Sequence, residues 1–123
     1  MERLTEDLIA VCGMNCGLCK AHLRKNNPCA GCRTIGAVGR KTIVFCKIRI
    51  CVERPGQYCF DCERFPCDWL KHIDKRYREK YGMSEIDNLI MIQDAGIDRF
   101  IESERAKWQS ANGIFCVHDK QIY

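Results

Sequence analysis

Ten of the eleven cysteines fall between residues 12 and 67, and their spacing limits the possible folds of this chain more than any other feature. In order they are Cys12, Cys16, Cys19, Cys29, Cys32, Cys46, Cys51, Cys59, Cys62 and Cys67. Three of the pairs have the form C-x-x-C, in which a two-residue insert lets the chain turn so that both sulfurs can bind one ion. The spacing therefore predicts a first half folded around metal, with these ten cysteines as ligands.

Cysteines at this density are usually cross-linked by disulfides or by metal. The first ten residues contain three acidic side chains and no apolar run of the kind that a secretory leader needs. No stretch approaches the roughly 20 apolar residues of a membrane span. We therefore expect a cytoplasmic protein, and in a reducing cytosol closely spaced cysteines usually hold metal. The expected cofactor is zinc, as two or three ions.

Two C-x-x-C pairs complete one tetrahedral zinc site. The simplest grouping joins Cys16 and Cys19 to Cys29 and Cys32, and joins Cys46 and Cys51 to Cys59 and Cys62. A cross-braced arrangement that exchanges the second and third pairs is the alternative. Cys12 and Cys67 are either small buried hydrophobic residues or additional ligands, in a third site or as bridging thiolates. We count them as ligands, because Cys67 would lie in the first turn of a helix starting at Pro66, where the helix dipole stabilises a thiolate.

Other chemistries fit the cysteines less well. Cys12, Cys16 and Cys19 match the iron–sulfur triplet of radical enzymes that use S-adenosylmethionine, but those enzymes need a barrel far larger than this chain. Iron–sulfur ligation in another grouping, or a redox or metal-carrier role, is an alternative. A closed four-thiolate zinc site leaves no position for water, so an enzyme is not favoured. His22 could add a ligand, whereas His72 is expected at the surface.

The second half carries the clearest helical periodicity. One helix is expected to run from Pro66 to Gly82, a second to begin after the capping residue Ser84, and a third to begin at Asp98 after a break at Gly96. Their apolar stripes predict core residues, namely Leu70, Ile73, Tyr77, Tyr81, Ile86, Leu89, Ile90, Ile92, Ile97, Phe100, Ile101 and Trp108.

The first half shows weaker signals of regular structure. Residues 1–11 predict a short helix or strand, and residues 41–50 alternate apolar side chains as a short strand or hairpin would. The prediction is a small, metal-stapled α+β fold in a single domain, residues 1–123. Its irregular zinc-knuckle half, 1–67, contains the short strand or hairpin and packs on a three-helix half, 68–123.

The formal net charge of +4 suggests a polyanionic partner until the metal is counted. Residues 1–67 hold 11 Lys and Arg against 6 Asp and Glu, whereas residues 68–123 hold 9 against 10. Each four-thiolate zinc site carries a net charge of about −2, so two sites bring the first half close to neutral. Another protein is therefore the expected partner. Nucleic acid is the alternative, supported by the basic residues Arg33, Arg40, Lys41, Lys47 and Arg49 with the aromatic residues Phe45 and Tyr58.

Several segments together resemble one known family. They are Cys12-Gly-Met-Asn-Cys16-Gly-Leu-Cys19, Cys29-Ala-Gly-Cys32, Cys46-Lys-Ile-Arg-Ile-Cys51 and Cys59-Phe-Asp-Cys62-Glu-Arg-Phe-Pro-Cys67, followed by the helical region from Tyr81 to Trp108. This order resembles the prokaryotic cysteine-rich family named domain of unknown function 3795 (DUF3795). The resemblance implies a bacterial or archaeal zinc-binding protein without an assigned activity. We therefore expect structural zinc in four-cysteine sites and a role as a protein-interaction or scaffold module.

Cys116 stands apart from the ten, 49 residues after Cys67. The resemblance implies that cysteines of a small additional ribbon would stand where this chain has Ser110 and Asn112. Cys116 and His118 alone supply two ligands, too few for a tight tetrahedral site. We expect Cys116 to be dispensable for metal, and Val117 and Ile122 to pack as a flap on the core.

Overall fold

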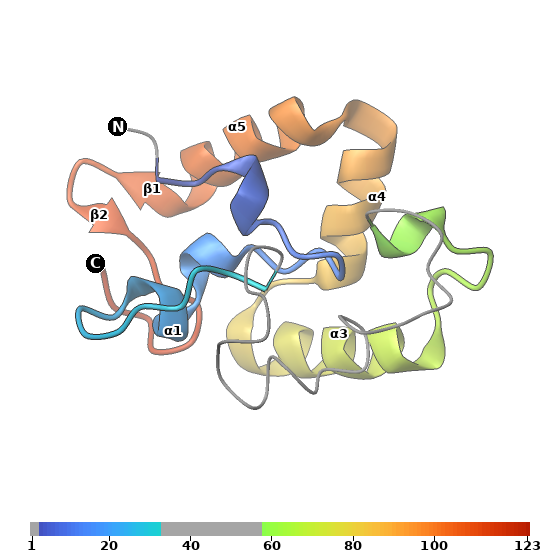
Figure 1. The fold of residues 1–123 in the computed structure, drawn as a ribbon, viewed down its shortest axis with the longest axis horizontal. Coiled ribbons are helices and arrows are strands. Elements are labelled where there is room, and N and C mark those ends of the chain that lie inside the picture. The colour runs from blue at the N-terminus through green and yellow to red at the C-terminus, as the bar shows by residue number, and fades with distance from the viewer. Residues whose placement is uncertain (1–2, 33–57) are drawn as a thin grey trace.

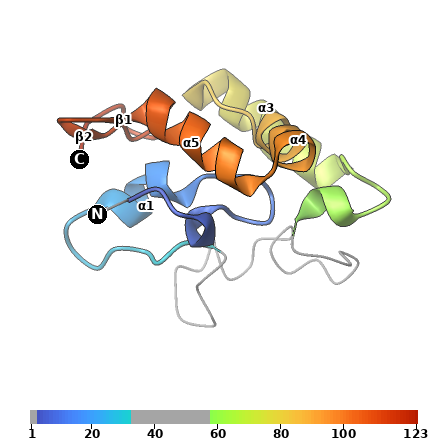
Figure 2. The ribbon, with the colours of Figure 1, turned by 90° about the horizontal axis from the view of Figure 1, so that it is seen from above.

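The computed structural model describes residues 3–32 and 58–123, which form two layers (Figures 1 and 2). One layer consists of the helices α3 (Asp68–Tyr81), α4 (Glu85–Ala95) and α5 (Ile97–Trp108). The other is the N-terminal segment, with the 3₁₀ turns η1 (Glu6–Leu8) and η2 (Cys16–Leu18) and the one-turn helix α1 (Lys20–Leu23). The 3₁₀ turn η3 (Cys59–Asp61) precedes α3, and an antiparallel hairpin of β1 (Gln109–Ser110) and β2 (Gly113–Ile114) follows α5. The α+β prediction is confirmed.

Helix α3 begins two residues later than the sequence predicts. Cys67 is its N-cap, with an extended backbone (φ −82°, ψ 171°), and the Cys67 carbonyl accepts a hydrogen bond of 2.9 Å from the Lys71 N–H. Pro66 therefore precedes the helix, and the placement of Cys67 in its first turn is wrong. The predicted end at Gly82 is confirmed, because Gly82 takes the left-handed conformation (φ +67°) that terminates helices.

The two following helices have the predicted boundaries to within one residue. Ser84 caps α4, since its hydroxyl accepts a hydrogen bond of 3.0 Å from the Asp87 N–H. Gly96 separates α4 from α5 and has φ +91°, a conformation that residues other than glycine rarely adopt. Helix α5 begins at Ile97, one residue before the predicted start at Asp98.

The helices bury their apolar stripes against the N-terminal segment and against each other. Leu70, Leu89, Phe100 and Ile101 are buried as predicted, together with Leu4, Leu8, Ile9 and Leu18 from the N-terminal layer. On α4 the buried positions are Glu85, Leu89 and Ile92. The sequence prediction placed Ile86 and Ile90 in this stripe. Ile90 is instead 42% exposed, because each residue advances about 100° around the helix and Ile90 falls outside the row of positions 85, 89 and 92.

The short strand predicted from the sequence and the hairpin in the structure lie in different parts of the chain. The predicted strand at 41–50 lies outside the described residues. The hairpin at β1 and β2 was missed, since two-residue strands leave no alternating pattern. The short element predicted within residues 1–11 is present as η1. In the C-terminal tail Val117 is fully buried as expected, whereas Ile122 is 50% exposed.

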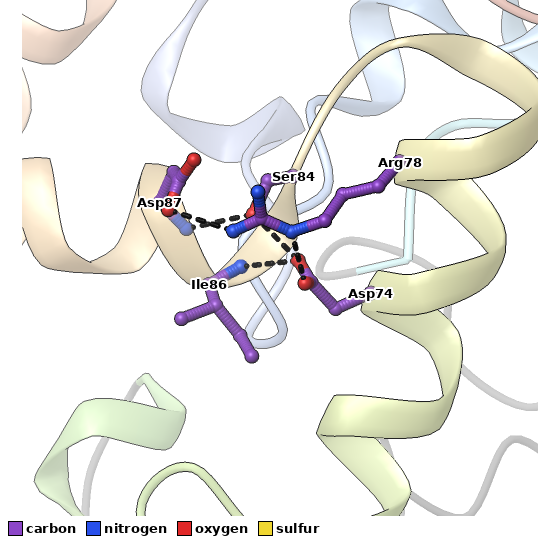
Figure 3. A network of polar contacts seen from close by, with 5 residues as sticks. All are labelled: Asp74, Arg78, Ser84, Ile86 and Asp87. Carbon is purple, nitrogen blue, oxygen red and sulfur yellow. Dashed lines mark hydrogen bonds and ion pairs between the residues drawn. The ribbon is translucent and has the colours of Figure 1, made fainter.

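A network of polar contacts connects α3 with the start of α4 (Figure 3). Asp74 accepts hydrogen bonds from the Ser84 hydroxyl (2.6 Å), the Ile86 N–H (3.0 Å) and the Arg78 Nε (2.7 Å). Arg78 also donates to Asp87 at 2.9 Å. Burial alone would raise the pKa of Asp74. The hydrogen bonds from the three donors lower this pKa by a larger amount, so the net shift is downward.

Among residues 3–32 and 58–123, no helix combines the length and the apolar character that crossing a membrane requires.

Candidate metal centre

Two of the C-x-x-C pairs adopt the same local structure. In both, a 3₁₀ turn starts at the first cysteine, and the second cysteine donates its N–H to the carbonyl of the first at 3.1 Å. The second cysteines, Cys19 and Cys62, have nearly equal backbone angles (φ −86°, ψ 135° and φ −91°, ψ 137°). A 3₁₀ turn brings side chains three residues apart onto one side. This is the arrangement that two sulfurs sharing one ion require.

The third pair, Cys29 and Cys32, lies against the first turn. The Cys32 N–H donates to the Cys16 Sγ at 3.4 Å, and the Gly31 N–H donates to the Cys29 Sγ at 3.4 Å. Gly31 has φ +104°, a conformation that glycine adopts without steric cost. Backbone N–H donors of this kind orient and stabilise metal-bound thiolates. Cys32 therefore lies beside Cys16, and the grouping of Cys16 and Cys19 with Cys29 and Cys32 stays a prediction.

Three thiols of this region have raised pKa values. Burial and the nearby Cys32 and Cys59 raise the pKa of Cys12, and burial together with Cys32 and Cys29 raises that of Cys19. The pKa of Cys16 is raised first by its hydrogen bond with the Cys32 side chain and then by burial. Because like charges repel and burial disfavours charge, these thiols are neutral unless a cation compensates them. A divalent ion would supply that compensation.

Cys12 lies between the two C-x-x-C turns. Its neighbour Val11 accepts a hydrogen bond of 2.9 Å from the Cys59 N–H, so the second turn lies against the Cys12 segment. Cys12 also interacts electrostatically with both Cys32 and Cys59. Cys12 is therefore close to cysteines of both predicted zinc sites, although the sequence predicted two separate sites.

The remaining predicted ligands are Cys46, Cys51, Cys62 and Cys67. Cys62 and Cys67 are half-buried near the start of α3, and Cys46 and Cys51 lie outside the described residues. The nine cysteines within residues 3–32 and 58–123 form no disulfide with one another. Within these same ranges, no three or more Cys, His, Asp or Glu side chains are grouped so that they could hold a metal ion.

The three histidines have different surroundings. His72 is exposed on α3, as predicted, and the His22 Nδ1 lies 2.6 Å from the Cys29 carbonyl oxygen. Both ring nitrogens of His118 are engaged. Its Nδ1 accepts from the Lys20 N–H at 3.1 Å, so the proton is assigned to Nε2, which donates to the Tyr77 hydroxyl at 2.9 Å. Burial lowers the pKa of His118, and the neutral ring ties the C-terminal tail to the residue that follows Cys19.

Two buried polar residues beside the cysteines, Asn15 and Glu85, were not predicted from the sequence. Asn15 is fully buried; its side-chain oxygen accepts from the Gly17 N–H at 3.0 Å, and its amide donates to Glu104 at 3.2 Å. Its position before a C-x-x-C turn is one that favours a capping residue, so this signal was present. Glu85 is also fully buried, and burial together with nearby Asp74 raises its pKa to about 8. No sequence signal marks Glu85, because an acidic residue in a first helical turn is ordinary.

Comparison with known proteins identifies the family. The model of the family described as Protein of unknown function (DUF3795) matches residues 8–72, just over half of the chain, and the chain belongs to this family. No curated protein and no solved structure matches.

Proposed function

We propose that this DUF3795 protein is a zinc-binding protein in which two or three Zn²⁺ ions, held by the ten cysteines between Cys12 and Cys67, fold the cysteine-rich half of the chain. The zinc is structural, in four-cysteine sites, and the folded unit serves as a protein-interaction module.

The repeated C-x-x-C turn is the observation that supports zinc most strongly. Two segments 43 residues apart, at Cys16 and Cys59, form the same 3₁₀ turn, and a third pair directs a backbone N–H at a sulfur. Repetition of one cysteine geometry is expected where each pair supplies half of a tetrahedral site. The raised pKa values of Cys12 and Cys16 are consistent with ligands that ionise when an ion binds.

The interaction role is supported by exposed apolar side chains. Trp69 on α3 is 48% exposed and Ile90 on α4 is 42% exposed. Large aromatic residues at the surface are enriched in protein–protein interfaces. Both side chains therefore present apolar surface that a partner could cover.

Metal analysis tests the zinc proposal. Protein purified under reducing conditions should contain two or three zinc ions per chain by elemental analysis. Strong chelation should then expose the amides of residues 3–32 to hydrogen exchange before those of α3, α4 and α5, because the metal-binding free energy is also folding free energy. Protein without zinc, or the charge-transfer absorption of an iron–sulfur cluster in anaerobic material, would refute the proposal.

Affinity capture from the native cell tests the interaction role. A protein captured by the wild type should be lost with the Trp69→Ser/Ile90→Ser double variant. Ile122→Ser is the matched control, because Ile122 is similarly exposed (50%) but lies in the C-terminal tail. Equal capture by all three proteins would show that these two side chains do not form the interface.

A further inference from the structure

Glu85 is a buried carboxylate without a hydrogen-bond partner among the described residues. It is the first residue of α4 and its side chain is fully buried. Within residues 3–32 and 58–123, neither carboxylate oxygen accepts a hydrogen bond from another residue. An isolated buried carboxylate is strongly unfavourable, so it must be protonated or lie beside a cation.

The local groups that could compensate Glu85 are already occupied. At the start of α4, the Ile86 N–H donates to Asp74 and the Asp87 N–H donates to the Ser84 hydroxyl (Figure 3). The guanidinium of Arg78 is shared between Asp74 and Asp87. These N–H donors and this side-chain cation, which would ordinarily compensate an acid at a helix start, are therefore committed to other acceptors.

The first turn of α4 packs directly on the Cys12–Gly13 turn. The Asn88 amide donates to the Gly13 carbonyl at 2.8 Å. A Cβ atom on Gly13 would lie only 2.4 Å from the Glu85 carbonyl oxygen and 2.8 Å from the Leu89 Cγ, so the two segments are in close contact. Cys12, the residue before Gly13, is itself buried, with 8% of its surface exposed. Glu85 and Cys12 thus share one buried region.

From this placement we infer that the Glu85 carboxylate is an oxygen ligand of the zinc ion bound by Cys12. The inference rests on the proposed zinc binding and adds a carboxylate to a ligand set predicted to contain only cysteine. A zinc ion would compensate the carboxylate and the thiolate together, and both are accepted zinc ligands. The site at Cys12 would then combine sulfur and oxygen, unlike a closed four-thiolate site.

Glu85→Gln tests the inference, since glutamine keeps the size of the side chain and removes its charge. Glu104→Gln is the matched control. Glu104 is also a buried glutamate with a raised pKa, caused chiefly by burial, but its carboxylate accepts hydrogen bonds from Asn15 and Trp108. Three quantities are measured: zinc per chain, zinc affinity by chelator competition, and the sulfur and oxygen shells in zinc X-ray absorption spectra.

Wild type and Glu104→Gln should show sulfur and oxygen ligands and the full zinc count. Glu85→Gln should lose the oxygen contribution and bind one zinc at least about tenfold more weakly, or lose it. An all-sulfur wild-type spectrum, or a Glu85→Gln variant with unchanged spectrum and affinity, overturns the inference and leaves the zinc proposal intact. Wild-type protein without zinc overturns both. If Glu85→Gln does not fold, the wild-type spectrum alone decides.

Discussion

The two C-x-x-C turns share a backbone conformation but differ in their surroundings. At Cys16–Cys19 the turn is enclosed: Cys16 is 4% exposed, and Leu18 and the preceding Asn15 are fully buried. At Cys59–Cys62 both cysteines are half-buried and Asp61 is exposed. The two-residue spacing therefore sets the shape of the turn, whereas the rest of the chain sets its burial.

The C-terminal tail accounts for much of the difference. The Val117 N–H donates to the Leu18 carbonyl at 3.1 Å, and His118 accepts from the Lys20 N–H, so the tail covers the first turn from both sides of Cys19. No corresponding backbone hydrogen bond from the tail to the second turn occurs among the described residues. If both turns bind zinc, the first site should be coupled to the core and the second should be more independent of it.

The largest expected effect comes from removing one ligand in each turn. Cys16→Ser should lose one zinc and unfold residues 3–32, since a structural zinc contributes on the order of 10 kcal/mol of binding free energy. Cys62→Ser should also lose zinc but leave residues 3–32 protected, because its turn lies at the edge of the molecule. Elemental analysis and hydrogen exchange measure both outcomes. Equal loss of protection in residues 3–32 in the two variants would remove the distinction between the turns.

The contrast between the two turns requires that the layer of α3, α4 and α5 is stable without zinc. Asp74→Asn should lower the free energy of unfolding at pH 7 by about 3 kcal/mol, because Asp74 is a buried acceptor of three hydrogen bonds. Urea titration gives the value. Asp87→Asn is the control: its side chain is 64% exposed and should cost less than about 1 kcal/mol.

The same pair of proteins gives a pH test. The pKa of Asp74 is lowered in the folded state, so its stabilising contribution is complete above the unfolded value of 3.8 and is lost as pH falls through the folded value. The difference between wild type and Asp74→Asn should therefore shrink when pH is lowered from about 5 to below about 3. A difference that stays constant over this range would show that Asp74 does not act through its charge.

A smaller effect separates the capping groups of the two turns. Asn15→Ala should cost about 2 kcal/mol, because it leaves the Gly17 N–H and the Glu104 carboxylate without their buried partner. Asp61→Ala removes a capping contact of the second turn, where the exposed Asp61 carboxylate accepts from the Tyr58 N–H at 3.2 Å, and should cost less than about 1 kcal/mol. Thermal unfolding of the two variants checks this order. Similar costs would indicate that burial does not distinguish the turns.

Local sequence signals predicted the helices well. Ser84, Gly82 and Gly96 act through their own side chain or backbone freedom, so their roles are visible without the fold. The start of α3 was misplaced because Pro66 suits a first helical turn but does not require one. The exposure of Ile90 and the burial of Glu85 depend on which face of α4 meets the Cys12–Gly13 turn, and this is a tertiary property.

The candidate site was only partly predictable for the same reason. The C-x-x-C spacing predicts the turns at Cys16 and Cys59, because a two-residue insert is a local constraint. The position of Cys12 between the two turns depends on the contact of Val11 with Cys59, 48 residues later in the chain. Spacing carries no information about such a contact.

The smallest effect is expected at Cys116, which lies next to Val117 in the C-terminal tail that covers the first turn. Its side chain is fully buried, and its pKa is raised by burial and by the hydrogen bond that its thiol donates to the Asp119 carboxylate. Cys116→Ser keeps a donor of similar size, so the Asp119 contact can be retained, and the cost should be at most about 1–2 kcal/mol. The full zinc count should be kept, because the neighbouring His118 already uses both ring nitrogens, for Lys20 and Tyr77. Elemental analysis of the purified variant measures this. Loss of one zinc per chain would instead make Cys116 a ligand, and would mean that the tail holds the first turn through metal as well as through hydrogen bonds.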